Sequence, residues 1–337
     1  MSMLQSIAIF ISVALMSMAA TGMILKYLRK KAILDHPNER SSHTIPTPRG
    51  GGIGLLIAVL PALFLVQYNA TNPLNGYLPV LICTLGLAGL SWIDDLKNLG
   101  PAVRFMVQIG CVVICLYTLS IPEQGYLGGF LPDIIERIIL GLGWLWFINL
   151  FNFMDGIDGI SGVEIMAISL GLSLIAFAAP LSAEYIQTGL IFGAGALGFL
   201  RWNWHKAKIF MGDVGSIPMG FLLGWVLILL AGEGHVIAAI ILALYYLSDA
   251  TLTLFKRLMR KEKIWQAHRE HYYQKATQLG MAHDAVVVKI ALLNCLLIFF
   301  AWLSVVYDQW IALLLSLVSV AFCLVHFARR ADSKELK

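Results

Sequence analysis

Residues 3–25 read MLQSIAIFISVALMSMAATGMIL, a run without a single charged side chain. A helix of about 20 apolar residues is long enough to cross the hydrocarbon core of a bilayer. The run is also too long for the apolar part of a signal peptide, and no basic residues precede it. We therefore expect a membrane-spanning helix here rather than a cleavable leader.

The rest of the 337-residue chain has the same character. Hydrophobic residues make up 59% of it and charged residues 13%, whereas soluble proteins contain about 45–50% and about 25%. These fractions exclude a soluble enzyme, a disordered protein and a secreted disulfide scaffold. The five cysteines lie inside apolar runs and show no C-x-x-C spacing, so we interpret them as packing residues.

Apolar runs of spanning length recur along the chain, and helices satisfy their own backbone hydrogen bonds in lipid. We predict an all-α polytopic membrane protein with about eleven transmembrane helices, forming a single integral membrane domain over residues 1–337. The predicted spans are 3–25, 50–68, 77–93, 104–120, 134–151, 161–180, 185–200, 216–232, 235–255, 286–306 and 309–327.

The basic residues are distributed unevenly between the connections. Except for Arg137, every Lys and Arg lies within about four residues of one alternate set of connections, the side that the positive-inside rule assigns to the cytoplasm. That set comprises 26–49, 94–103, 152–160, 201–215, 256–285 and the tail after 327. We therefore expect the N-terminus outside, the C-terminus in the cytoplasm, and 256–285 as a basic cytoplasmic loop.

Asp94 and Asp95 follow the span predicted at 77–93. Carboxylates at a membrane boundary are costly and indicate function by default. Two adjacent carboxylates repel each other unless a cation lies between them, and Mg²⁺ prefers such hard oxygen ligands. The alternative is a solvated helix end with Lys97 nearby.

A second polar cluster is the segment 149–159, NLFNFMDGIDG. If this segment is helical, Asp155 and Asp158 share a face with Asn152. Its glycines allow the backbone to approach a ligand closely, and the segment has no basic residue to neutralise it. The alternative is a glycine turn with aspartate caps.

A third cluster is the segment 201–216, RWNWHKAKIFMGDVGS. Asp213 stands between glycines just before a predicted span, where it can offer a metal ligand beside backbone N–H groups that bind anions. Phe210 and Trp204 could stack on a nucleobase, or they could belong to the aromatic belt of the membrane interface.

Two further clusters are weaker alone. In 268–275, HREHYYQK, His268 and His271 lack the partners of a zinc motif, so phosphate binding by Arg269 and His271 is expected instead. The basic run from Lys256 to Lys263 is also typical of residues that bind anionic lipid headgroups. The stretch 35–52, DHPNERSSHTIPTPRGGG, is alone only a loop with polar caps.

Five polar clusters on one predicted membrane face nevertheless indicate a site for a diphosphate, a divalent metal and a lipid. Their order and spacing from Asp35 to Gln274 resemble the polyprenyl-phosphate N-acetylhexosamine-1-phosphate transferases, the MraY/WecA group of glycosyltransferase family 4. The most specific elements are 152–159, NFMDGIDG, and 210–216, FMGDVGS.

This resemblance implies a Mg²⁺-dependent enzyme, with Mn²⁺ as the other candidate metal, in the bacterial inner membrane with its active site facing the cytoplasm. It would transfer a UDP-activated N-acetylaminosugar-1-phosphate to undecaprenyl phosphate and release UMP. The catalytic and metal-binding residues implied are Asp94, Asp95 and Asp213. The substrate-binding residues implied are Asn152, Asp155, Asp158, Asn203, Phe210, Arg269 and His271. A homodimer is implied as well.

The chain departs from the family pattern at two places. Asn98 stands where a third acid is common, and His271-Tyr272-Tyr273-Gln274 stands where the WecA type has His-x-His-His. The resemblance is therefore nearest to the branch that initiates O-antigen of lipopolysaccharide and related surface glycans. The alternatives are a phospho-MurNAc-pentapeptide transferase of peptidoglycan synthesis and, from another class, a transporter, although transporter sites lie near the bilayer midplane.

Overall fold

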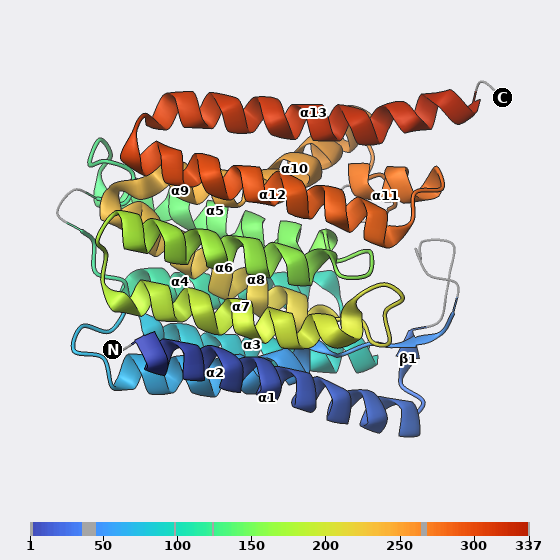
Figure 1. Cartoon of the computed structure of the whole chain (residues 1–337), viewed down its shortest axis with the longest axis horizontal. Helices are drawn as coiled ribbons and strands as arrows, with labels where there is room; N and C mark the ends of the chain where they lie inside the picture. The colour runs from blue at the N-terminus through green and yellow to red at the C-terminus, as the bar shows by residue number, and fades with distance from the viewer. Residues whose placement is uncertain (1–2, 36–44, 98, 123–124, 264–267, 336–337) are drawn as a thin grey trace.

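The computed structural model describes residues 3–35, 45–97, 99–122, 125–263 and 268–335, with side chains to residue 328. Long helices lie side by side along one direction, and the two ends of the chain lie at opposite ends of the bundle (Figure 1). Asn98 and most of the polar stretch between Asp35 and Ile45, both noted in the sequence, lie outside the described residues.

The elements follow the predicted order. The helices are α1 (Met3–Lys30), α2 (Gly52–Tyr68), α3 (Tyr77–Lys97), α4 (Pro101–Thr118), α5 (Asp133–Phe153), α6 (Ile160–Ala178), α7 (Ala183–Asn203), α8 (Asp213–Leu230), the π-helical turn η1 (Ala231–His235), α9 (Val236–Leu242), α10 (Leu244–Met259), α11 (Tyr272–Gln278), α12 (His283–Val306) and α13 (Gln309–Glu335). Two short strands, β1 (Leu34–Asp35) and β2 (Thr47–Pro48), pair antiparallel.

The all-α membrane class is confirmed. Within the described residues, eight helical segments are long and apolar enough to cross a membrane. They are α1, α3, α4, α5, α6, the continuous stretch Asp213–Leu242, α12, and Gln309–Ala328 of α13. Eleven spans and the orientation of the termini stay predictions.

The chain between the spans predicted at 216–232 and 235–255 differs from expectation. No extended loop separates them, because the helix continues through η1 and kinks at Gly234, whose φ of 87° is open mainly to glycine. The second of these spans is also divided, since Ala243 leaves helical geometry between α9 and α10.

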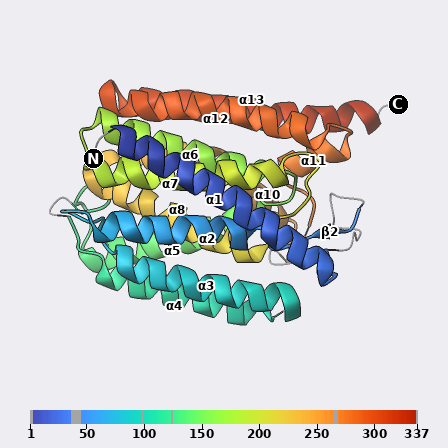
Figure 2. The same ribbon diagram turned by 60° about the horizontal axis from the view of Figure 1, so that its bottom comes forward.

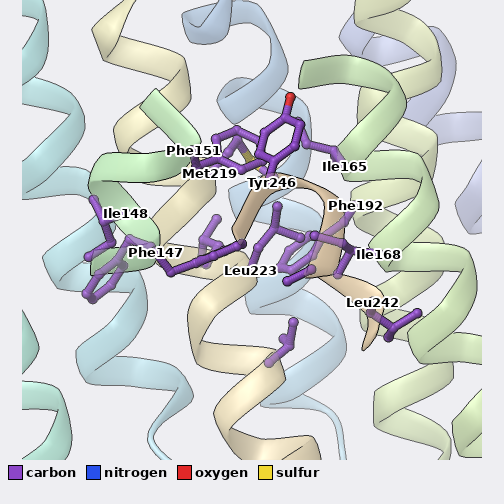
Figure 3. Close-up of a cluster of buried hydrophobic side chains, with 14 of the residues drawn as sticks. Phe147, Ile148, Phe151, Ile165, Ile168, Phe192, Met219, Leu223, Leu242 and Tyr246 are labelled. Carbon is purple, nitrogen blue, oxygen red and sulfur yellow. The ribbon is translucent and has the colours of Figure 1, made fainter. Parts of the chain in front are cut away.

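Helix α8 is the centre of the bundle. Every residue of α8 except Leu227 is buried, and the helix packs against α2, α3, α5 and α6. A helix that is apolar on all sides belongs in such an interior. Figure 3 shows the core beside it, where Phe151 of α5, Met219 of α8 and Tyr246 of α10 meet. The pairs α12–α13 and α3–α4 form opposite sides of the bundle (Figure 2).

The first turns of α2 and α8 touch through glycines. A Cβ added to Gly52 would overlap the backbone of Gly215, so neither position has room for a side chain. Small residues allow membrane helices to approach this closely. The contact brings the segment before α2 against the segment before α8.

Those two segments are joined by backbone hydrogen bonds. The Phe210 N–H donates to the Pro48 carbonyl at 2.9 Å, and the Gly51 N–H donates to the Phe210 carbonyl at 2.8 Å. Arg49 therefore lies beside Phe210 and close to Asp213, although 164 positions of sequence separate Arg49 from Asp213.

Candidate active site

Three carboxylates and two arginines meet where α3 ends and α8 begins. Arg104, in the first turn of α4, bridges Asp94 at 2.7 Å and Asp213 at 3.1 Å. Arg49 pairs with Asp95 at 3.1 Å and with the other oxygen of Asp213. We call these five side chains the carboxylate–arginine cluster. The structure thus brings together the three aspartates that the sequence singled out.

The backbone fixes the orientation of these carboxylates. The Val214 N–H, in the first turn of α8, donates to Asp95 at 3.2 Å, where the positive end of the helix dipole stabilises the anion. The Leu99 N–H donates to Asp94 at 2.7 Å. Gly212 has a φ of 76° and its Cα faces Asp95, so a side chain there would be strained and crowded.

Asn152 connects the cluster to the loop after α5. Its amide donates to Ser216 at 2.8 Å and lies 3.3 Å from Asp213. The loop itself differs from the helical alternative considered for it. Because α5 ends at Phe153, Asp155 and Asp158 lie in a turn and not on one helix face.

The carboxyl of Asp155 has a raised pKa. Desolvation raises the pKa of its carboxyl to about 7, with a smaller contribution from the charges of Asp213 and Asp95. A hydrogen bond with Ser161 and the charge of Arg49 act in the opposite direction. The carboxyl of Asp155 is therefore only partly ionised at neutral pH.

Asp158 is held by groups from two other parts of the chain. Its Oδ2 lies 2.8 Å from His205 Nδ1 and 3.4 Å from His283 Nδ1, and it accepts the Ala207 N–H at 3.2 Å. Burial alone would raise the pKa of Asp158, but the hydrogen bonds from the two histidines and the Ala207 N–H lower it. The absence of a basic residue near Asp158 in the sequence is thus compensated across space.

The side chain of Asn203 and the backbone of Phe210 make hydrogen bonds that join segments of the site. The buried amide of Asn203 accepts the Gly159 N–H at 3.0 Å and donates to the Ile209 carbonyl at 2.9 Å. It therefore locks the loop after α5 to the loop before α8. Phe210 itself has a half-buried side chain, and its backbone is hydrogen bonded to Pro48 and Gly51.

His271 and Arg269 precede α11. The His271 side chain is 2% exposed, and its Nδ1 lies 3.4 Å from the buried Asp249. Burial and the neighbouring charge of His271 lower the pKa of His268 to about 4, so His268 is neutral at pH 7. The backbone of Arg269 accepts a hydrogen bond from Gln278 at 2.6 Å. Tyr273 connects the start of α11 to the loop after α5, because its hydroxyl donates to the Phe153 carbonyl at 3.1 Å.

Two groups of donors could hold a metal ion. The carboxylate–arginine cluster offers only hard oxygen ligands, from Asp94, Asp95 and Asp213, which suit Mg²⁺ or Mn²⁺. Three carboxylates face two guanidiniums there, so a cation is compatible with the local charge. Among the residues that the structure describes, Asp158, His205 and His283 also bring ligand atoms within 4.8 Å of one another.

The sequence prediction missed four residues of the site. In the sequence, Arg49 is part of the 35–52 segment, which alone is a loop with polar caps, Arg104 is one of many basic residues near one membrane face, and His205 and His283 have no assigned role. Arg49 did carry a signal, since prolines and glycines restrict the chain around it. The other three lie among ordinary rim residues, and only their partners across the fold distinguish them.

The sequence of this chain is similar to those of known proteins. Residues 77–231 match the family model described as glycosyl transferase family 4. A probable undecaprenyl-phosphate N-acetylglucosaminyl 1-phosphate transferase of Bacillus subtilis is 25% identical over 335 residues, which cover 95% of this chain and 90% of the relative. Decaprenyl-phosphate N-acetylglucosaminephosphotransferases are 27% identical in Mycobacterium leprae, over 84% of this chain and 79% of the relative, and 26% identical in Mycobacterium tuberculosis, over 96% and 89%.

The described residues thus form a multi-pass membrane protein, and its sequence is similar to the phosphotransferases of glycosyl transferase family 4. Over most of its length it is similar to polyprenyl-phosphate N-acetylglucosamine-1-phosphate transferases, so the resemblance to the MraY/WecA group found in its motifs is confirmed.

Proposed function

We propose that this protein transfers the sugar-1-phosphate of a UDP-N-acetylaminosugar to undecaprenyl phosphate and releases UMP. The observation that carries the proposal is the convergence of Asp94, Asp95 and Asp213 with Arg49 and Arg104 at one end of a membrane bundle. Such a cluster suits a reaction in which several phosphate charges must be held together at a lipid boundary.

The reaction requires positioning and charge stabilisation rather than a strong base. An oxygen of the acceptor phosphate forms a bond to the β-phosphorus of the UDP-sugar, while the bond from that phosphorus to the bridging oxygen breaks and UMP leaves with that oxygen. A phosphate monoester has its second pKa near about 6, so the acceptor is already largely ionised at neutral pH. Asp94 and Asp95 would then position the metal or the acceptor, and neither needs to remove a proton.

The arginines contribute the complementary charge. A guanidinium binds phosphate oxygens through two parallel N–H groups, and both Arg49 and Arg104 sit against the carboxylates that border the site. Mg²⁺ bound by Asp213, with Asp94 and Asp95, would supply neutralisation of the diphosphate. Asn152 fixes Asp213 and Ser216 in position.

For the sugar, the relatives and the motif favour different members of one class. The relatives named above act on N-acetylglucosamine, whereas Tyr273 and Gln274 stand where the WecA type has histidines. We therefore propose a UDP-N-acetyl sugar of surface-glycan or O-antigen synthesis, with UDP-N-acetylglucosamine as the first donor to compare. The protein would act as a homodimer in the bacterial inner membrane, with the site facing the cytoplasm.

The test is UMP release by the purified full-length chain in lipid, with polyprenyl phosphate, a panel of UDP-N-acetyl sugars, and either Mg²⁺, Mn²⁺ or a chelator. We expect release that needs both lipid acceptor and divalent cation, and Asp213→Asn should lose nearly all of it. Release that continues in chelator, or in Asp213→Asn, would exclude the metal role. No release with any donor would leave the transporter or another class to be considered.

Two rival pathways are separable in the same assay. Turnover with UDP-MurNAc-pentapeptide but not with simple UDP-N-acetyl sugars would favour the peptidoglycan enzyme. A double displacement would place the sugar phosphate on an aspartate before the acceptor attacks. Labelled phosphate trapped on Asp94 in the absence of acceptor would overturn direct transfer.

A further inference from the structure

Asp249 lies on α10, outside the carboxylate–arginine cluster, and has no exposed surface. Its Oδ1 accepts the Tyr272 N–H at 2.9 Å, and its Oδ2 accepts the Tyr273 N–H at 3.2 Å. These N–H groups open α11 and have no partner within that helix. A buried carboxylate is retained only when it is hydrogen bonded, so Asp249 anchors α11 firmly to α10.

Tyr273 extends from that anchored helix to the loop after α5. Its ring is fully buried and stacks on His271, with 5.7 Å between ring centroids and 15° between planes. Its hydroxyl donates to the carbonyl of Phe153, the last residue of α5. Two residues later the chain reaches Asp155. Tyr273 therefore separates His271 from the Asp155 loop by a fixed distance.

Gly156 confirms how closely the loop approaches this hydroxyl. A Cβ added to Gly156 would overlap the Tyr273 hydroxyl oxygen and lie 3.0 Å from Gln274 Nε2. Gly156 is not among the glycines with positive φ. The glycine is therefore required for space rather than for backbone conformation, and the loop has no room for even a methyl group.

We propose that Tyr273 is a positioning residue of the transfer reaction, whose hydroxyl sets the separation between the His271 segment and the Asp155 loop. Asp249 anchors the start of α11, from which the Tyr273 side chain extends. The inference rests on the proposed function, with the Asp155 loop on the nucleotide-sugar side of the site, as the resemblance implies for Asp155 and Asp158. Displacement of a binding group by about 1 Å can cost on the order of 100-fold in rate, so a fixed spacer has a measurable effect.

The first variant is Tyr273→Phe, which keeps the ring and its stacking and removes only the hydroxyl. We expect the KM for the UDP-sugar to rise by about 10-fold or more, the equivalent of about 1.4 kcal/mol, while the KM for polyprenyl phosphate is unchanged. The matched control is Tyr185→Phe, which also deletes a buried hydroxyl, hydrogen bonded to Glu233 at 3.0 Å. The control should retain both KM values.

The second test uses the contact itself. Gly156→Ala should reduce kcat/KM strongly in the native background, because the methyl group meets the hydroxyl. In Tyr273→Phe the nearest atoms would be Gln274 Nε2 at 3.0 Å and the ring carbon Cζ at 3.1 Å, so the added penalty of Gly156→Ala should shrink by about 5-fold or more. If Gly156→Ala lowers kcat/KM by the same factor in wild type and in Tyr273→Phe, then Gly156 and the Tyr273 hydroxyl do not interact. That result would overturn the inference.

The wild-type chain distinguishes the two levels of failure. If wild type releases no UMP from any UDP-sugar, the proposed function fails. If wild type is active and Tyr273→Phe matches it in both KM values, the spacer role fails and the function stands. Thermal unfolding of every variant separates loss of fold from loss of positioning. A Tyr273→Phe that raises both KM values equally and lowers the midpoint would indicate a purely structural role and contradict the proposal.

Discussion

Arg104 shows at the residue scale what single side chains contribute to this site. Its guanidinium lies between Asp94 and Asp213, which come from different helices. Charge-assisted hydrogen bonds contribute about 1.5–3 kcal/mol each. Arg104→Gln should therefore lower UMP release by roughly 10- to 100-fold. The control is Arg29→Gln, which removes the same charge from an exposed position at the end of α1. Equal activity of the two variants would show that Arg104 is an ordinary rim residue.

Asp155 gives a prediction for the pH dependence of stability. The pKa of its carboxyl is raised to about 7 in the folded chain, against about 3.9 when unfolded. Between these values the folded state binds more protons than the unfolded state, so the free energy of unfolding falls as pH rises from about 4 to about 7. Thermal unfolding should show this loss in wild type and a smaller one in Asp155→Asn. Identical pH profiles for the two would contradict the assignment.

Arg137 explains why the charge rule had one exception. It lies far from the other basic residues in the predicted topology, yet its guanidinium donates to the carbonyls of Leu116 and, at 3.1 Å, Leu119. These carbonyls end α4 and lack partners within it. A cation there binds a helix C-terminus, which is favourable whichever side of the membrane it faces.

At the scale of elements, the contact between α2 and α8 is the joint that aligns the site. Gly52 and Gly215 leave no room for a Cβ. Gly215→Ala should therefore push the helices apart, lower the yield of folded protein and abolish UMP release. Gly86→Ala in α3 is the matched control, since a Cβ there meets nothing within 4 Å. Fluorescence-detected size exclusion and thermal unfolding measure both. A stable, active Gly215→Ala would mean that the joint is flexible.

The elements also show what sequence could predict. Each predicted span lies mostly in helix, because a run of apolar residues has one stable backbone form in lipid. Nothing in the sequence predicts the break at Ala243, since its neighbours are as apolar as those in any other span.

Likewise, the aspartates could be found from their cost near lipid, whereas Arg104, His205 and His283 could not. Their significance arises from pairing across the fold, which composition and spacing do not record.

For the whole molecule, the distribution of charge and the direction of the chain make one joint prediction. The chain ends lie at opposite ends of the bundle (Figure 1), and the sequence predicts eleven crossings with the N-terminus outside. The carboxylate–arginine cluster lies where α3 ends and α4 begins, at the end that carries most basic residues. If that end is cytoplasmic, nucleotide sugars reach the site directly.

Labelling single cysteines in a cysteine-free background, in intact cells, with a maleimide that does not cross membranes tests this orientation. Thr71→Cys lies after α2, and Lys30→Cys lies at the end of α1; both positions are exposed. We expect Thr71→Cys to be labelled in intact cells and Lys30→Cys only after permeabilisation. UMP release by each variant checks that the fold is kept. The reverse pattern would place the site outside the cell, away from the nucleotide sugars that the proposed reaction consumes, and would refute both the orientation and the function.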